Sequence, residues 1–156
     1  MREVERIARQ LQKTFEGKAW HGPAVAETLD GVSAELAATP GPGGTHSIWQ
    51  IVLHMNIWQD AVARWLAGDT SRPNDEESWP VISDTSDAAW RKAVASLRSS
   101  YERLRTEVPK LHDARLGDPI FDNMPSIYST LHGVIHHNLY HAGQIALLKK
   151  VGRGGH

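Results

Sequence analysis

The chain has 156 residues, with nine histidines, six tryptophans, no cysteine and a formal net charge of −1. Without cysteine, the chain has no disulfides, thiolate metal sites, iron–sulfur clusters or cysteine nucleophile. Its acidic and basic residues are mixed, so we expect no nucleic-acid partner. No apolar stretch is long enough to span a membrane, and the charged N-terminus does not read as a signal peptide. We therefore expect one cytoplasmic domain over residues 1–156.

Apolar side chains recur at three- and four-residue spacings in four long segments, as is typical of amphipathic helices. The first segment ends at Gly17, a natural helix stop, and the second has plausible N-caps at Thr45 and Ser47 and a glycine stop at Gly68. The third is limited by Pro109. The four predicted helices are about residues 4–15, 45–67, 90–108 and 126–151.

The connections between these helices are marked by proline, glycine and polar residues. A shorter helical stretch is expected from Pro23 to Val32, extending or resuming at residues 35–38. Residues 39–44 form a loop, and polar linkers cover about residues 69–85 and the stretch up to Pro125. Four long helices with two long connections predict an all-α four-helix bundle.

The helical rotation of about 100° per residue places the histidines around each predicted helix. His54 falls on the same arc as the apolar side chains of its helix. On the last helix, His137 and His141 stack at the edge of the core arc, whereas His132 and His136 project from the more polar side. The helical wheel therefore favours the His137/His141 pair.

Two imidazoles four residues apart on a helix can bind one metal ion, and a third from a facing helix leaves a position open for water or substrate. This combination of His54, His137 and His141 is typical of catalytic metal sites. Imidazole ligands alone do not choose among zinc, nickel, iron, copper and cobalt. The alternative is that the three histidines are core residues bonded to backbone carbonyls or carboxylates. No HExxH motif is present, so the sequence does not predict a zincin-type glutamate base.

Two segments carry a resemblance to a known family. Residues 46–54 (HSIWQIVLH) resemble the start of the second bundle helix of the DinB/YfiT-like family, and residues 137–145 (HNLYHAGQI) look like its HxxxHxGQI signature. The similarity continues in residues 20–23 (WHGP), in Trp79-Pro80 and in the helix spacing, over nearly the whole chain.

The resemblance implies an up-down-down-up bundle that holds one divalent transition metal, namely zinc, nickel, iron or manganese. By position, its ligands are His54, His137 and His141, the same three that the helical wheel selects. It also implies a homodimer and a small-molecule substrate. Related bundles include transferases and isomerases that use low-molecular-weight thiols such as bacillithiol or mycothiol, so a thiol-dependent transferase is favoured over a hydrolase. The catalytic residues stay unassigned.

Several other polar and aromatic residues are candidates for supporting roles. Hydrogen bonds that orient metal-bound imidazoles could come from Gln144, Tyr140, Asn138 or Asp60. Trp79 is a candidate pocket wall or dimer contact, and Gly143 is a candidate point of close helix contact or of approach to the site. Glu76 and Glu77 could supply a base if their linker folds over the metal. Loop, helix-start or tail positions are expected for His21, His46, His112 and His156.

Three functions remain open at this point. The first is a metal-dependent enzyme that acts on a small molecule. The second is a non-enzymatic, metal-stabilised bundle involved in a stress response. The third is a helical interaction module in which the histidines only pack.

Overall fold

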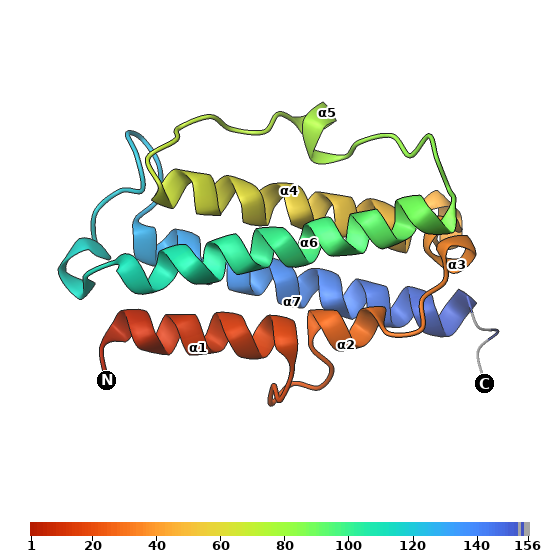
Figure 1. Cartoon of the computed structure of the whole chain (residues 1–156), viewed down its shortest axis with the longest axis horizontal. Coiled ribbons are helices and arrows are strands. Elements are labelled where there is room, and N and C mark those ends of the chain that lie inside the picture. The colour runs from red at the N-terminus through yellow and green to blue at the C-terminus, as the bar shows by residue number, and fades with distance from the viewer. Residues whose placement is uncertain (153, 155–156) are drawn as a thin grey trace.

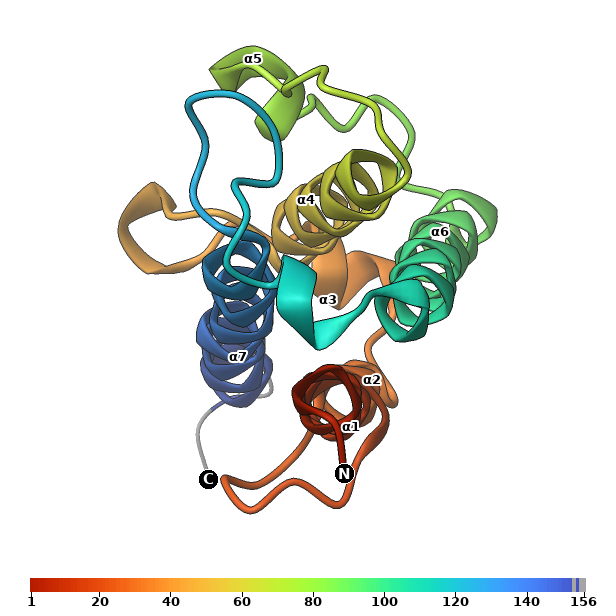
Figure 2. The same ribbon diagram turned by 90° about the vertical axis from the view of Figure 1, so that its left-hand side faces the viewer.

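Four long helices carry the fold: α1 (Glu3–Glu16), α4 (Ile48–Leu66), α6 (Asp87–Glu107) and α7 (Ile127–Gly152). The computed structural model describes residues 1–152 and 154, so His156, expected in the tail, lies outside the described residues. The long helices pack as a four-helix bundle (Figures 1 and 2). No strand occurs in the described part of the chain, which confirms the all-α prediction.

Short helical elements lie in the connections. These are α2 (Val25–Leu29), α3 (Ala34–Ala38), α5 (Asp75–Ser78) and three 3-10 turns at Pro42–Gly44, Val108–Lys110 and Asp113–Arg115. The predicted stretch from Pro23 is thus two helices, separated at Gly31, whose φ of 68° lies in the left-handed region that ends a helix. Helix α5 was not predicted, because four polar residues carry no apolar periodicity.

The helix directions agree with an up-down-down-up bundle. Helices α1 and α7 run in one direction, and α4 and α6 run in the other (Figure 1). Because α4 and α6 are parallel, the chain between them must return along the whole bundle, and it carries α5 across the outside of α4 (Figures 1 and 2). None of the helices within the described residues has both the length and the apolar character that crossing a bilayer requires.

Local capping explains where α4 and α6 begin. Ser47 Oγ accepts the Gln50 N–H at 3.2 Å, and the Gln50 side-chain oxygen accepts the Ser47 N–H at 2.9 Å, which forms a capping box. At α6, Ser86 Oγ accepts the Ala89 N–H at 3.2 Å. Because the first residue of α4 is fixed in this way, the helical rotation determines which of its later residues face the core.

A buried polar network ties three of the long helices together. Asn138 Nδ2 on α7 donates to Gln59 Oε1 on α4 at 2.9 Å, and Gln59 Nε2 donates to Ser100 Oγ on α6 at 3.3 Å. All three residues are fully buried. A buried polar group without its partner is costly, so these bonds favour one register of α4 against α6 and α7.

Removing one member of this network should destabilise the bundle. We expect Asn138→Ala to lower the free energy of unfolding by about 1–3 kcal/mol, because Gln59 Oε1 loses its donor. The double variant Gln59→Leu/Asn138→Leu should cost less than the sum of the two single leucine variants, since neither amide is left unpaired. Urea unfolding followed by circular dichroism measures this, and strictly additive costs would contradict the pairing.

The first turn of α1 is capped from far along the chain. The Asp113 carboxylate accepts the backbone N–H of Glu3 at 2.8 Å and of Val4 at 3.0 Å. Both N–H groups belong to the helix end that has no internal partner. The Val4 bond, followed by the Glu3 bond, holds the pKa of Asp113 below its ordinary value of 3.8.

This cap predicts a pH-dependent effect. Because the folded-state pKa of Asp113 is lowered, its stabilising contribution is present above pH 3.8 and is lost as the pH falls through the lowered value. Asp113→Ala should therefore lower the melting temperature at pH 7, and its difference from wild type should shrink in strong acid. Thermal unfolding at both pH values tests this, with the exposed Asp122→Ala as control. If Asp113→Ala lowers the melting temperature by the same amount at both pH values, the Asp113 carboxylate does not stabilise α1 through its charge.

Candidate metal centre

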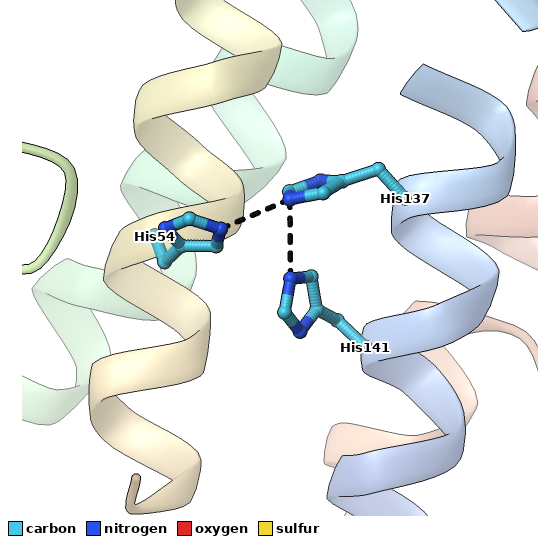
Figure 3. A group of neighbouring side chains, drawn as sticks. All are labelled: His54, His137 and His141. Atoms are coloured by element: carbon cyan, nitrogen blue, oxygen red, sulfur yellow. Dashed lines mark hydrogen bonds between the residues drawn. The ribbon is translucent and has the colours of Figure 1, made fainter. Parts of the chain in front are cut away.

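Three histidines from two helices point toward one another in the seam between α4 and α7 (Figure 3). His54 lies two turns into α4, and His137 and His141 lie one turn apart on α7. His54 and His141 are buried, and His137 is half-buried. The structure thus brings together the three residues that the sequence selected.

The distances between the ring nitrogens have the scale of a metal-ligand set. His137 Nε2 lies 3.0 Å from His54 Nε2 and 3.1 Å from His141 Nε2. One ligand atom from each of the three rings lies within 4.8 Å of the others. Around a tetrahedral zinc ion with bonds of about 2.0–2.1 Å, neighbouring nitrogens are roughly 3.3 Å apart. The two shorter distances lie just below this spacing, so the cluster is close to an arrangement that would hold one such ion.

Hydrogen bonds at the outer nitrogens fix the tautomer of two rings. His54 Nδ1 lies 2.9 Å from the Ser78 backbone carbonyl, and His141 Nδ1 lies 2.6 Å from the side-chain carbonyl oxygen of Gln144. A carbonyl oxygen only accepts, so each Nδ1 carries the proton and each Nε2 presents a lone pair. Such outer hydrogen bonds commonly orient metal-bound histidines. His137 Nδ1 has no partner among the described residues.

The inner nitrogens cannot satisfy one another without a cation. Burial lowers the pKa of His137 to about 3, with a further lowering from His141 and His54. Burial also lowers the pKa of His54 and of His141. With all three rings neutral, His137 Nε2 carries at most one proton, which can serve one of its two close contacts and leaves the other without a hydrogen bond. A metal ion among the three nitrogens removes that conflict, so these residues fit one.

An aromatic stack covers one side of the cluster. The Trp79 ring lies parallel to His54, with ring centroids 3.9 Å apart, and parallel to His46 on its other face at 3.7 Å. Ser78, the preceding residue, is held by Trp58 Nε1, which donates to Ser78 Oγ at 2.9 Å. Ser78, the last residue of α5, therefore supplies a hydrogen-bond acceptor for His54, and Trp79, the next residue, supplies a cover over its ring.

A cavity of about 650 Å³ gives a small molecule access to the His141 side of the cluster. His46, Trp79, Tyr140 and Gln144 contribute to its wall, together with apolar side chains near the end of α7. Its size falls within the range of about 300–1,000 Å³ that is typical of small-molecule sites. The prediction that Trp79 forms a pocket wall is thus confirmed.

Of the polar residues expected to orient the imidazoles, one does so and two have other partners. Gln144 does orient a ring of the cluster, but Asn138 bonds Gln59, and Asp60 pairs with Arg64 and Arg103. Neither of these two polar side chains supports the histidines, because their partners lie elsewhere in the bundle.

Glu76 and Glu77 are exposed on α5, and the Glu77 carboxylate accepts the Asn74 N–H instead of facing the cluster. The close helix approach expected at Gly143 is wrong, because a Cβ built there meets nothing within 4 Å. No described carboxylate belongs to the histidine cluster, so its donors are the three imidazoles alone.

The remaining histidines lie outside the ligand set. His132 and His136 have ring centroids 6.0 Å apart, and neither belongs to the cluster. His46 precedes α4 as expected, but its ring stacks on Trp79 rather than serving the helix start. Ser78 was missed by sequence reasoning, since it has no periodicity; its only signal was its place next to Trp79-Pro80.

An up-down-down-up bundle with three facing imidazoles between its second and fourth long helices defines a class of helical proteins with a candidate metal centre. The family model described as the DinB superfamily matches residues 19–145, a range that includes all three histidines. The chain therefore belongs to the DinB superfamily. No curated protein and no solved structure gives a significant match.

The hydrogen bond from His141 to Gln144 predicts an effect on metal affinity. Gln144→Leu should weaken binding about 10- to 100-fold, because the imidazole loses the acceptor that fixes its tautomer and orientation. Gln144→Glu keeps an acceptor and should retain most of the affinity. Competition with a chromophoric chelator measures both variants, and equal affinities for Gln144→Leu and wild type would show that this bond has no orienting role.

Proposed function

We propose that this DinB superfamily protein binds one divalent transition metal through the Nε2 atoms of His54, His137 and His141 and acts as a metal-dependent enzyme on a small molecule. The observation that carries the proposal is the convergence of three imidazoles from two helices, with His137 Nε2 3.0 Å from His54 Nε2 and 3.1 Å from His141 Nε2, a spacing that a shared metal ion would account for. Zinc, nickel, iron and manganese are the candidate ions that the family resemblance implies, and the imidazoles alone do not distinguish among zinc, nickel and iron.

Three protein ligands leave coordination positions for a substrate or water, which supports catalysis over a closed structural site. When bound, a metal ion of this kind polarises an oxygen or lowers the pKa of a water or thiol. The chain's own residues have distinct tasks around it. Ser78 and Gln144 hold two imidazoles in one tautomer, and Trp79 keeps water from one face of His54.

Within this class we favour a thiol-dependent transferase over a hydrolase, with a low-molecular-weight thiol as one substrate. The support comes from the family resemblance, and the cavity of about 650 Å³ beside His141 is large enough for a small molecule. The chain's lack of cysteine means that any thiol must come from a second molecule.

A second candidate function is a metal-stabilised bundle without chemistry, for instance in a stress response. The Trp79 ring stacked on His54 favours it, since a covered ligand limits the approach of a substrate. In this case the metal would raise the melting temperature, but no added thiol or water would exchange at the ion.

A homodimer and a cytoplasmic location are further proposals. Tyr140, Leu147 and Val151 are exposed on α7, and exposed apolar side chains on one helix face support contact with a second copy. The lack of cysteine agrees with a reducing compartment.

Elemental analysis of untagged protein purified without chelators tests the metal site. We expect about one transition-metal ion per chain, lost in His54→Ala and in His137→Ala, because two imidazoles bind far more weakly than three. His136→Ala is the matched control, since it removes an imidazole from the same helix but outside the cluster. No metal after reconstitution with zinc, nickel, iron and manganese would refute the proposal.

Experiments on cobalt-substituted protein then distinguish a thiol-dependent transferase from a hydrolase and from a metal-stabilised bundle. A thiol that binds the ion directly shifts the cobalt absorption spectrum, as expected for the transferase. Turnover with water as the only co-substrate would instead indicate a hydrolase. A spectrum that no thiol changes, together with a raised melting temperature, would favour the metal-stabilised bundle.

A further inference from the structure

A second cavity, of about 350 Å³, lies in the α4–α7 seam on the other side of the cluster and reaches His137. Its volume lies at the small end of the range typical of small-molecule sites, about 300–1,000 Å³. Most of its wall is aromatic or aliphatic. These side chains are Trp58, Val62, Trp65, Met124 and Val134.

One positive charge stands at this apolar cavity. Arg72, from the connection between α4 and α6, contributes to its wall, and no acidic residue does so within the described part of the chain. Arg72 is held near the cavity because Trp65 Nε1 donates to the carbonyl of the preceding Ser71 at 2.7 Å. The guanidinium therefore belongs to an anchored segment rather than a free loop.

Arg72 has no counter-ion among the described residues. On its other side it lines a polar cavity that includes Asp60 and Glu77. Asp60 is already paired with Arg64 and Arg103, and the Glu77 carboxylate accepts the backbone N–H of Asn74. Arg72 itself forms no ion pair or hydrogen bond to any described side chain or backbone group. Its donors are free for a ligand.

We propose that this second cavity binds a small amphipathic carboxylate, such as a single aromatic ring with a short acidic side chain. The apolar body would pack against Trp58 and Trp65, and the carboxylate would accept hydrogen bonds from the planar guanidinium of Arg72. The inference names a ligand class for the proposed metal centre and rests on that function for the reaction, whereas binding itself needs only the cavity and Arg72.

Calorimetric titration of the full chain with phenylacetate and 3-phenylpropionate tests the proposal, with phenylacetamide as the neutral analogue. We expect both carboxylates to bind and the amide to bind at least tenfold more weakly, since a charge-assisted hydrogen bond contributes about that much. Arg72→Gln should weaken the carboxylates about tenfold and leave the amide unchanged. Arg91→Gln, which removes another exposed arginine, on α6, should leave all three unchanged.

Two results would contradict the proposed carboxylate site. Failure of both carboxylates to bind at millimolar concentration, or equal affinities in Arg72→Gln and Arg91→Gln, would overturn the proposal. Metal content is measured on the same samples and should be the same in both arginine variants. Carboxylate binding by a chain that takes up no metal would refute the proposed metal centre while leaving this cavity's ligand class in place.

Discussion

A neutral imidazole has one proton for its two nitrogens, so fixing the proton on one side of the ring fixes a lone pair on the other. That constraint organises the centre of this bundle. The Ser78 carbonyl and the Gln144 side chain each hold a proton on the outer side of a ring. Burial lowers the pKa of both rings and so disfavours a second proton, which leaves the two inner lone pairs available to a metal ion. The capping box at Ser47 and the network at Gln59 fix the helices that present these rings.

Much of the fold could be predicted from the sequence, because the signals that define helices are local. Gly17 and Ser47 lie at observed helix boundaries, and the helical wheel separated His137 and His141 from the more polar His132/His136 pair. Two ligands on one helix are related by its rotation alone. The third, His54, could be assigned because its place on an apolar arc already implied that it faces another helix.

The parts that could not be predicted depend on contacts between distant segments. Nothing in the composition of residues 69–86 indicates that Ser78 accepts a hydrogen bond from His54, or that the Trp79 ring lies between two imidazoles. The free guanidinium of Arg72 is likewise visible only once Asp60 and Glu77 are seen to be engaged elsewhere. The periodicity of apolar residues predicts which face of one helix is buried, but it does not predict which loop packs against that face.

The parallel course of α4 and α6 has a consequence for how such a protein can change over evolutionary time. A connection that must return along the whole bundle lies against the long helices over much of its length, and here it passes over the outside of α4 and supplies Arg72, Ser78 and Trp79. The buried helix faces that maintain the architecture lie mostly outside this stretch. Mutations in the connection can therefore reshape ligand preference with little effect on the scaffold, so selection can act on the two almost independently.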